Sequence, residues 1–306
     1  MKKIFLIMLF PFVLLGQNTD LSFGARMFNP SIINPAAAGL INNGHSGVFI
    51  ENHSKFVGLE GAPSISSVGY NGRILSDQIG IGVNLINDEV GAISQYKFAT
   101  DLSYKIKASN QLTISFGLKG GVSQNTFETS RVEILNPGDA MAIDQFNNNL
   151  IYDLGIGIFI YSEDFFIEAA LPLLTNEDLF STNVESELKL RTGYLYSSFG
   201  FKFSDNRGFQ IIPSVALYKS KYSALIKEVS LMTLIPNYFF GLSYRFESHF
   251  SILAGVNLFD SLSVGYTYEN IVSNMVSASR SSHGIFLKLN FGSLKPVNVN
   301  LVSPRF

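Results

Sequence analysis

The 306-residue sequence contains no cysteine and no tryptophan, and only four histidines. The absence of cysteine excludes disulfide bridges, iron–sulfur clusters and cysteine nucleophiles. The histidines, His45, His53, His249 and His283, are scattered and show no metal-binding spacing. The sequence also lacks a nucleophile-elbow motif and a phosphate-binding loop. We therefore expect no catalytic residue, no metal and no cofactor.

Charge is also scarce, at 15% of residues against about 25% in a typical soluble domain. The 22 basic and 24 acidic residues leave a net charge of −2, so no basic surface for nucleic acid is expected. Aromatic residues reach 13% and the mean hydropathy is +0.22. This composition disfavours a soluble enzyme.

Only one long apolar run is present, at residues 4–15. It follows Met1-Lys2-Lys3 and is followed by the polar Gly16-Gln17-Asn18. This order predicts a secretory signal peptide at residues 1–16 and export of the chain, with a buried N-terminal helix as the alternative. No later run approaches the length of a membrane-spanning helix. An exported, charge-poor chain of this kind favours a closed barrel of strands, because lipid offers no partners for backbone hydrogen bonds.

Two-residue alternation recurs along the chain, as such a barrel requires. Tyr238, Phe240 and Leu242, for example, alternate with Gly241 and Ser243. We expect an all-β fold, a transmembrane outer-membrane β-barrel of about fourteen antiparallel strands spanning residues 44–292, with twelve or sixteen strands as alternatives. The expected strands are 44–53, 65–75, 78–88, 93–106, 110–123, 150–161, 164–171, 188–203, 207–219, 223–235, 237–246, 250–259, 262–268 and 283–292.

The connections between these strands differ in length. Even-numbered strands end in short polar turns, whereas most odd-numbered strands are followed by longer segments at 54–64, 124–149, 172–187 and 269–282. Bacterial barrels have short periplasmic turns and longer outer loops, so this asymmetry predicts periplasmic termini. The periplasmic N-terminal segment 17–43 and the C-terminal tail 293–306 either plug the barrel or lie against a periplasmic partner. Disorder is a further alternative for the tail.

Several charges fall on the inward face of the expected strands. These are Lys97, Asp101, Lys105, Lys119, Glu168, Lys189, Arg191, Arg245, Glu269 and Lys288. We favour a paired network that fills the lumen, and a lining that selects ions in a pore is the alternative. Inward Leu195, Leu253 and Phe286 favour the filled lumen.

Short motifs occur in order along nearly the whole chain. Asn34-Pro35-Ala36-Ala37-Ala38-Gly39 makes a rigid turn that would seat the N-terminal segment under the barrel. Val57-Gly58-Leu59-Glu60-Gly61-Ala62-Pro63 gives the first outer loop a defined bend. The simplest interpretation is that both are only turns. Further motifs are Tyr152-Asp153-Leu154-Gly155-Ile156-Gly157, Leu171-Pro172-Leu173-Leu174, Ser281-Ser282-His283 and Ser303-Pro304-Arg305-Phe306.

Together these motifs resemble the PorP/SprF family, outer-membrane proteins of the type IX secretion system of Bacteroidetes. The segment Glu51-Asn52-His53-Ser54-Lys55-Phe56 departs from the family's Arg-x-Gln-Trp stretch and keeps only its aromatic residue. Gly284 stands where the family often has Glu. The chain therefore resembles a divergent member.

The resemblance implies a non-enzymatic scaffold that supports secretion or surface anchoring of a large adhesin-type protein, a role linked to gliding motility. The implied partners are the secreted adhesin at the outer loops, periplasmic secretion-machinery or peptidoglycan-binding proteins at the inner side, and outer-membrane lipid. The alternatives are a passive outer-membrane porin and a membrane hydrolase, and the missing catalytic cluster disfavours the hydrolase. The candidate partner-binding residues are Asn34, Pro35, Gly39, Phe56, Gly61, Pro63, Met141, Ile143, Leu179, Phe180 and Met275.

Overall fold

Strands form most of the regular structure in the computed structural model, which describes residues 21–40, 46–74, 77–128, 150–174, 193–205, 207–220, 224–259, 261–272 and 281–291. The strands are β1 (Ser46–Ser54), β2 (Ser64–Arg73), β3 (Ile79–Val90), β4 (Ile93–Lys107), β5 (Thr113–Phe127), β6 (Leu150–Tyr161), β7 (Phe165–Leu171), β8 (Tyr194–Phe201), β9 (Phe203–Ser204), β10 (Gln210–Ser220), β11 (Ile226–Ile235), β12 (Tyr238–Arg245), β13 (His249–Phe259), β14 (Leu262–Ile271) and β15 (Ser281–Phe291). Three short helices precede them, namely α1 (Phe23–Phe28), η1 (Pro30–Ile32) and η2 (Pro35–Ala37).

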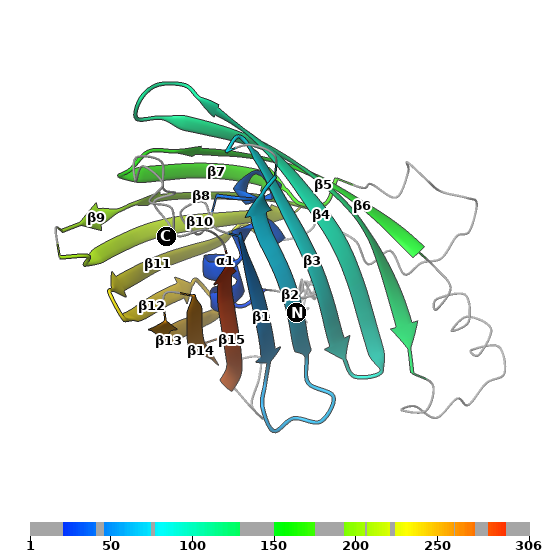
Figure 1. Cartoon of the computed structure of the whole chain (residues 1–306). Helices are drawn as coiled ribbons and strands as arrows, with labels where there is room; N and C mark the ends of the chain where they lie inside the picture. Colours follow the sequence, from blue (N-terminus) through cyan, green and yellow to red (C-terminus); the bar gives the residue numbers. More distant parts are fainter. Residues whose placement is uncertain are drawn as a thin grey trace, which may run out of the picture.

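The strands close into one antiparallel barrel (Figure 1). Neighbours in sequence pair with each other, and the pairing of β15 with β1 closes the ring. The two-residue strand β9 pairs with the same edge of β10 as β8 does, so it continues β8. The wall therefore has fourteen strands, and the expected fold class is confirmed.

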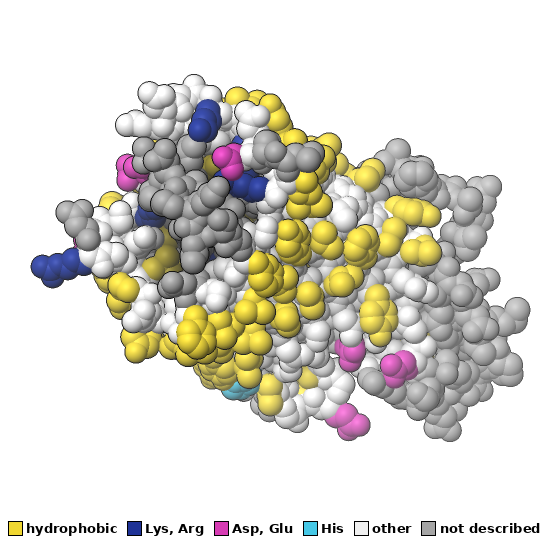
Figure 2. Space-filling model, in the orientation of Figure 1, with side chains coloured by type: hydrophobic (Ala, Val, Ile, Leu, Met, Phe, Trp, Pro, Cys, Tyr) yellow, Lys and Arg dark blue, Asp and Glu magenta, His cyan; other side chains and the backbone are white. Residues whose placement is uncertain are grey.

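The alternation places apolar side chains on the outside of the wall. In β12, Tyr238, Phe240 and Leu242 are 51%, 48% and 54% exposed, whereas Phe239 and Arg245 are buried. Figure 2 shows hydrophobic side chains spread across the outer wall on the visible side. This is the inverse of a soluble β-sandwich and is the pattern of a barrel in lipid. Among the described residues no helix is long and apolar enough to cross a bilayer.

The observed strands agree closely with the expected ones, and the two rims differ as predicted. At one rim, tight turns join β4 to β5, β6 to β7 and β11 to β12. The opposite rim, here called the long-loop rim, carries the connection 55–63 and the connections from β5 to β6, from β7 to β8 and from β14 to β15. The last three lie largely outside the described residues.

Candidate functional site: the plugged lumen

Residues 22–40, here called the plug, are all buried and lie within the barrel (Figure 1). The segment 17–43 is expected either to plug the barrel or to lie against a periplasmic partner. Its residues 22–40 occupy the lumen. The plug begins with helix α1, whose first turn is capped by the Ser22 hydroxyl accepting a hydrogen bond from the Ala25 N–H at 2.9 Å. Proline begins both η1 and η2, where its fixed φ favours helical geometry.

One side of the plug packs through aromatic rings. The Phe28 ring packs against both Phe239 and Phe286 of the wall, with ring centroids 4.8 and 4.7 Å away. Phe23 is also fully buried. These contacts fill the lumen near β12 and β15 with apolar atoms, so water is excluded there.

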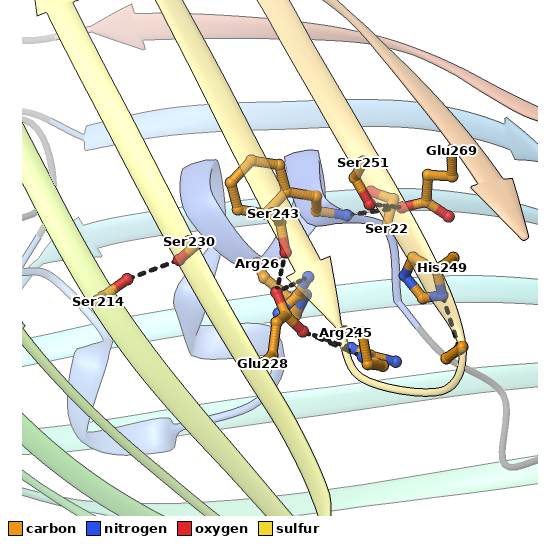
Figure 3. Close-up of polar contacts among 12 residues, drawn as sticks. Ser22, Arg26, Ser214, Glu228, Ser230, Ser243, Arg245, His249, Ser251 and Glu269 are labelled. Carbon is orange, nitrogen blue, oxygen red and sulfur yellow. Dashed lines mark hydrogen bonds and ion pairs between the residues drawn. The ribbon is translucent and has the colours of Figure 1, made fainter. Parts of the chain in front are cut away.

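A buried ionic cluster holds the middle of α1 (Figure 3). Arg26 Nη2 lies 2.7 Å from Glu228 Oε1, and Arg26 Nη1 donates to the Tyr218 hydroxyl at 2.7 Å. Arg245 donates to Glu228 Oε2 from Nε at 3.1 Å and from Nη2 at 2.9 Å. Ser243 donates to Glu228 Oε1 at 2.5 Å. Burial acts to lower the pKa of the Arg26 guanidinium, but Glu228 and Tyr218 together outweigh it and raise that pKa, so the side chain remains charged.

A second polar cluster holds the start of α1. The backbone N–H of Phe23 donates to Glu269 Oε1 at 3.3 Å, and Ser251 donates to the same oxygen at 3.3 Å (Figure 3). His53 Nε2 lies 3.2 Å from Glu269 Oε2. Ser22 donates to the Glu51 carboxylate. The positive end of the short helix thus faces acidic side chains of the wall.

An amide network joins the centre of the plug to β2, β3 and β4. Asn29 Nδ2 donates to Asn84 Oδ1 at 2.8 Å, and Asn71 Nδ2 donates to Ser31 Oγ at 2.7 Å. Asn84 Nδ2 in turn donates to Asp101 Oδ2 at 2.8 Å. Lys119 lies 3.3 Å from Asp101 Oδ1 and donates to the backbone carbonyl of Ile32 at 2.8 Å. Wall side chains therefore satisfy both side chains and backbone of the plug.

The turn at residues 34–39 is fixed in the same way. Asn34 Nδ2 donates to Glu168 Oε2 at 2.9 Å, while its Oδ1 accepts from the Ala36 N–H at 3.0 Å and caps η2. Further along, Ser103 donates to the Ala38 carbonyl at 2.7 Å and Lys105 to the Gly39 carbonyl at 2.6 Å. Gly39 has a φ of +64°, a conformation that favours glycine.

Glycines of the wall leave the space in which this turn lies. A Cβ on Gly117 would lie 2.1 Å from Ala36 N, and one on Gly157 would lie 2.0 Å from Asn34 Oδ1. A Cβ on Gly80 would lie 2.1 Å from the Ala38 carbonyl oxygen. Any larger side chain at these three positions would displace the plug, so strands β3, β5 and β6 are shaped to receive it.

Three of the predicted partner-binding residues lie in the plug. Asn34, Pro35 and Gly39 are buried against the wall, so they present no accessible face to a partner. Their turn seats the N-terminal segment, as expected, but within the barrel instead of beneath it. Burial of this turn depends on the glycines of distant strands, which a local motif does not reveal.

The other predicted partner-binding residues lie at the long-loop rim or outside the described residues. Phe56, Gly61 and Pro63 lie in the connection from β1 to β2, where Phe56 and Gly61 have positive φ values of 49° and 71°. Val57 and Leu59 beside them are 48% and 46% exposed. The candidates outside the described residues are Met141, Ile143, Leu179, Phe180 and Met275.

The inward charges were largely predicted. Buried ones are Asp101, Lys105, Lys119, Glu168, Arg245, Glu269 and Lys288, whereas Lys97 is half-buried and Lys189 and Arg191 lie outside the described residues. Leu253 and Phe286 are fully buried as expected. The inward placement of Leu195 is wrong, because its neighbour Tyr196 faces the lumen and leaves Leu195 45% exposed.

Two members of the ionic cluster, Arg26 and Glu228, were missed by sequence reasoning. Arg26 lies outside the expected strands, and Glu228 follows directly after another charge, Lys227, so the two charges alone do not show which one faces inward. Within the described residues, no group of three or more His, Asp or Glu side chains is placed to hold a metal ion.

A closed barrel with an apolar exterior and an occupied lumen defines the class, a membrane-spanning β-barrel. The sequence profile of the type IX secretion system membrane protein PorP/SprF matches residues 16–289. The chain belongs to the PorP/SprF family, and it is an outer-membrane β-barrel of type IX secretion.

Other comparisons add little. No curated protein sequence matches the chain. Solved structures with a similar fold include a triple mutant of the porin from Rhodopseudomonas blastica, at 10% identity and a TM-score of 0.36, covering 81% of this chain and 98% of that one. Another is described as a bacterial polysaccharide outer membrane secretin, at 9% identity and a TM-score of 0.46, covering 82% of this chain and 100% of that one. Neither likeness carries a functional argument.

Proposed function

We propose that this protein is a non-enzymatic scaffold of the type IX secretion system that supports secretion or surface anchoring of a large adhesin-type protein. The observation that carries the proposal is the plug, residues 22–40, which is buried throughout and bonded to the wall by ionic, amide and aromatic contacts. A wall built around a fixed internal segment suits a rigid platform better than a conduit.

Passive diffusion, the alternative function, requires a water-filled lumen. The Arg26–Glu228–Arg245 cluster and the rings of Phe28, Phe239 and Phe286 occupy that space instead. Opening the lumen would expose apolar rings and break a paired set of buried charges, which is costly. The filled lumen therefore favours the scaffold over the porin.

In this proposal the chain is exported by its N-terminal signal peptide in a Bacteroidetes cell, and its termini lie in the periplasm. The long-loop rim then faces outward and binds the adhesin. The connection 55–63 supports this assignment because Val57 and Leu59 are exposed there. Their loop is also fixed by hydrogen bonds from Val57 N–H to the Ser281 carbonyl at 3.0 Å and from Gly91 N–H to the Gly61 carbonyl at 2.9 Å. At the opposite rim the short turns would meet periplasmic secretion-machinery or peptidoglycan-binding proteins.

The test is a comparison of surface proteins between a clean deletion strain and the complemented strain. We expect one large surface protein to disappear from the deletion strain, together with any gliding that depends on it. Loss of many secreted proteins at once would instead assign this chain to the core machinery. An unchanged set of surface proteins, in a strain lacking related barrels as well, would contradict the proposal.

A further inference from the structure

A groove of about 360 Å³ crosses the outer face of strands β2 to β6, on the half of the wall nearer the long-loop rim. We call it the wall groove. It lies on the lipid-facing side, because Val68, Leu85 and Phe98 in its lining are outward residues that are 42%, 50% and 43% exposed.

The apolar part of the wall groove is a single cross-strand row. Val68 pairs with Leu85, Leu85 with Phe98, and Phe98 with Val122. Side chains opposite one another on one face of a sheet are in contact, so this row forms a continuous apolar floor. Gly120 is the next outward residue of β5 after Val122, in the direction away from the long-loop rim. A Cβ on Gly120 would meet no atom within 4 Å, so the groove is open at this end.

The next outward row towards the long-loop rim is polar from β2 to β5 and ends at the apolar Leu150 of β6. Ser66 pairs with Asn87, Asn87 with Tyr96, and Tyr96 with Gln124. All four line the wall groove. The groove therefore spans the boundary between the apolar band and the polar rim, the level at which lipid headgroups join their chains.

Asn87 has an unused hydrogen-bonding group at this boundary. Its Nδ2 donates to Glu89 Oε1 at 2.7 Å. Its Oδ1 is shielded from water and accepts no hydrogen bond from the residues that the structure describes. An acceptor in this position lacks a donor, and the terminal amide torsion is soft enough to turn it towards the groove.

We propose that the wall groove binds a membrane lipid whose acyl chain is joined to its headgroup through an amide. The chain lies on the apolar row, and the amide N–H or a neighbouring hydroxyl donates to Asn87. Ester-linked lipids offer only acceptors at this level and leave Asn87 Oδ1 unsatisfied. This binding site goes beyond the scaffold function and does not depend on it.

The absence of tryptophan allows a direct test, because one introduced tryptophan is the only indole fluorophore. Phe98→Trp places it in the groove, and Phe240→Trp, at an outward residue that is 48% exposed, is the matched control outside the groove. The variants are reconstituted in vesicles of dibrominated phosphatidylcholine, which quenches tryptophan. Unbrominated dioleoyl phosphatidylcholine or N-oleoyl sphingomyelin is then mixed in. The two share a headgroup and differ in their amide and hydroxyl donors.

At Phe98→Trp we expect sphingomyelin to relieve quenching about fivefold more effectively than phosphatidylcholine, because one net hydrogen bond strengthens binding by about this factor. At Phe240→Trp the two lipids should act equally. Adding Asn87→Leu to Phe98→Trp should remove the preference, whereas Asn52→Leu, in the same polar row, should keep it. Two results would overturn the proposal. One is equal relief of quenching by the two lipids at both tryptophans. The other is a preference for sphingomyelin that survives Asn87→Leu, in a barrel shown to be folded by its heat-dependent migration in gel electrophoresis.

Discussion

At the scale of single residues, Glu228 is the acceptor that allows two arginines to lie inside the barrel. Glu228→Gln keeps the shape but removes the carboxylate charge that pairs with both Arg26 and Arg245, and breaking a buried pair of this kind costs about 3–5 kcal/mol. We expect the barrel to unfold at lower denaturant concentration in detergent micelles. The unfolding midpoint, followed by circular dichroism, measures the effect.

The matched control is Asp77→Asn, which removes the ion pair between Arg73 and the largely exposed Asp77 but keeps the hydrogen bond from Arg73 to the Gly39 carbonyl. Surface pairs contribute about 1 kcal/mol or less, so this midpoint should hardly move. Equal midpoints for the two variants would mean that Glu228 does not stabilise the plugged barrel.

Sequence reasoning predicted the lumen residues unevenly. Arg245 and Glu269 were expected to face inward because each lies on the polar side of a clear alternation. Arg26 carries no such signal, since its partner Glu228 is supplied by a strand far away in the sequence. Asn34 was recognised as part of a turn, yet its burial against Glu168 depends on the closed barrel.

At the scale of elements, strands were predictable because each one faces two different solvents, lipid and lumen, and alternates accordingly. β12 is expected at 237–246 and observed at Tyr238–Arg245. The interruption at Lys202 between β8 and β9 was missed, because residues 199–203 alternate without a break in the sequence. The sequence left two positions open for the plug, the lumen and the periplasm. It could not decide between them, because the plug helices are three to six residues long and show no periodicity of their own.

The plug depends on the space left by wall glycines. Gly117→Leu would force side-chain atoms into the position of Ala36, so the plug should leave its place. Because the chain has no cysteine, Ala37→Cys, in a residue that is 1% exposed, reports this directly. We expect a membrane-impermeant maleimide to label the introduced thiol at least about tenfold faster in the Gly117→Leu background than without it.

Gly120→Leu is the control for this labelling, because it lies on the same strand and a Cβ there meets no atom within 4 Å. Labelling should stay slow in that background. Fast labelling of Ala37→Cys in the otherwise unchanged chain would show that the plug is not fixed.

The connection 55–63 is the described element best suited to a protein partner. Val57→Asp with Leu59→Asp would place charges on its exposed apolar side chains without removing a side-chain bond that the structure shows. We expect loss of the dependent surface protein at unchanged barrel abundance, measured by surface proteomics and immunoblotting. Ile74→Asp, at the opposite rim, should leave that surface protein in place. A full complement of surface protein in the double variant would exclude this loop from binding.

At the scale of the whole molecule, a wide apolar-walled barrel combines with a lumen that resembles a protein core. The wall supplies glycines and polar side chains, and the plug supplies aromatic rings, one arginine and backbone carbonyls. The two therefore form one folded unit, in which the plug makes the wall rigid and the wall keeps the plug buried. Such a unit is suited to presenting fixed rims on both sides of a membrane.

This combination predicts the electrical behaviour of the purified protein. In a planar bilayer the unchanged chain should pass no stepwise current, because ions would have to cross a lumen closed by paired charges and packed rings. Deleting residues 21–40 should open a conducting pore, since much of the wall that remains is lined by serine, asparagine and charged side chains, with aromatic rings such as Phe239 and Phe286 on one side. Heat-dependent migration verifies that the deleted barrel is folded, and Gly117→Leu provides a second route to the same opening. Steady conductance by the unchanged chain would instead favour the porin and would count directly against a platform with a fixed plug.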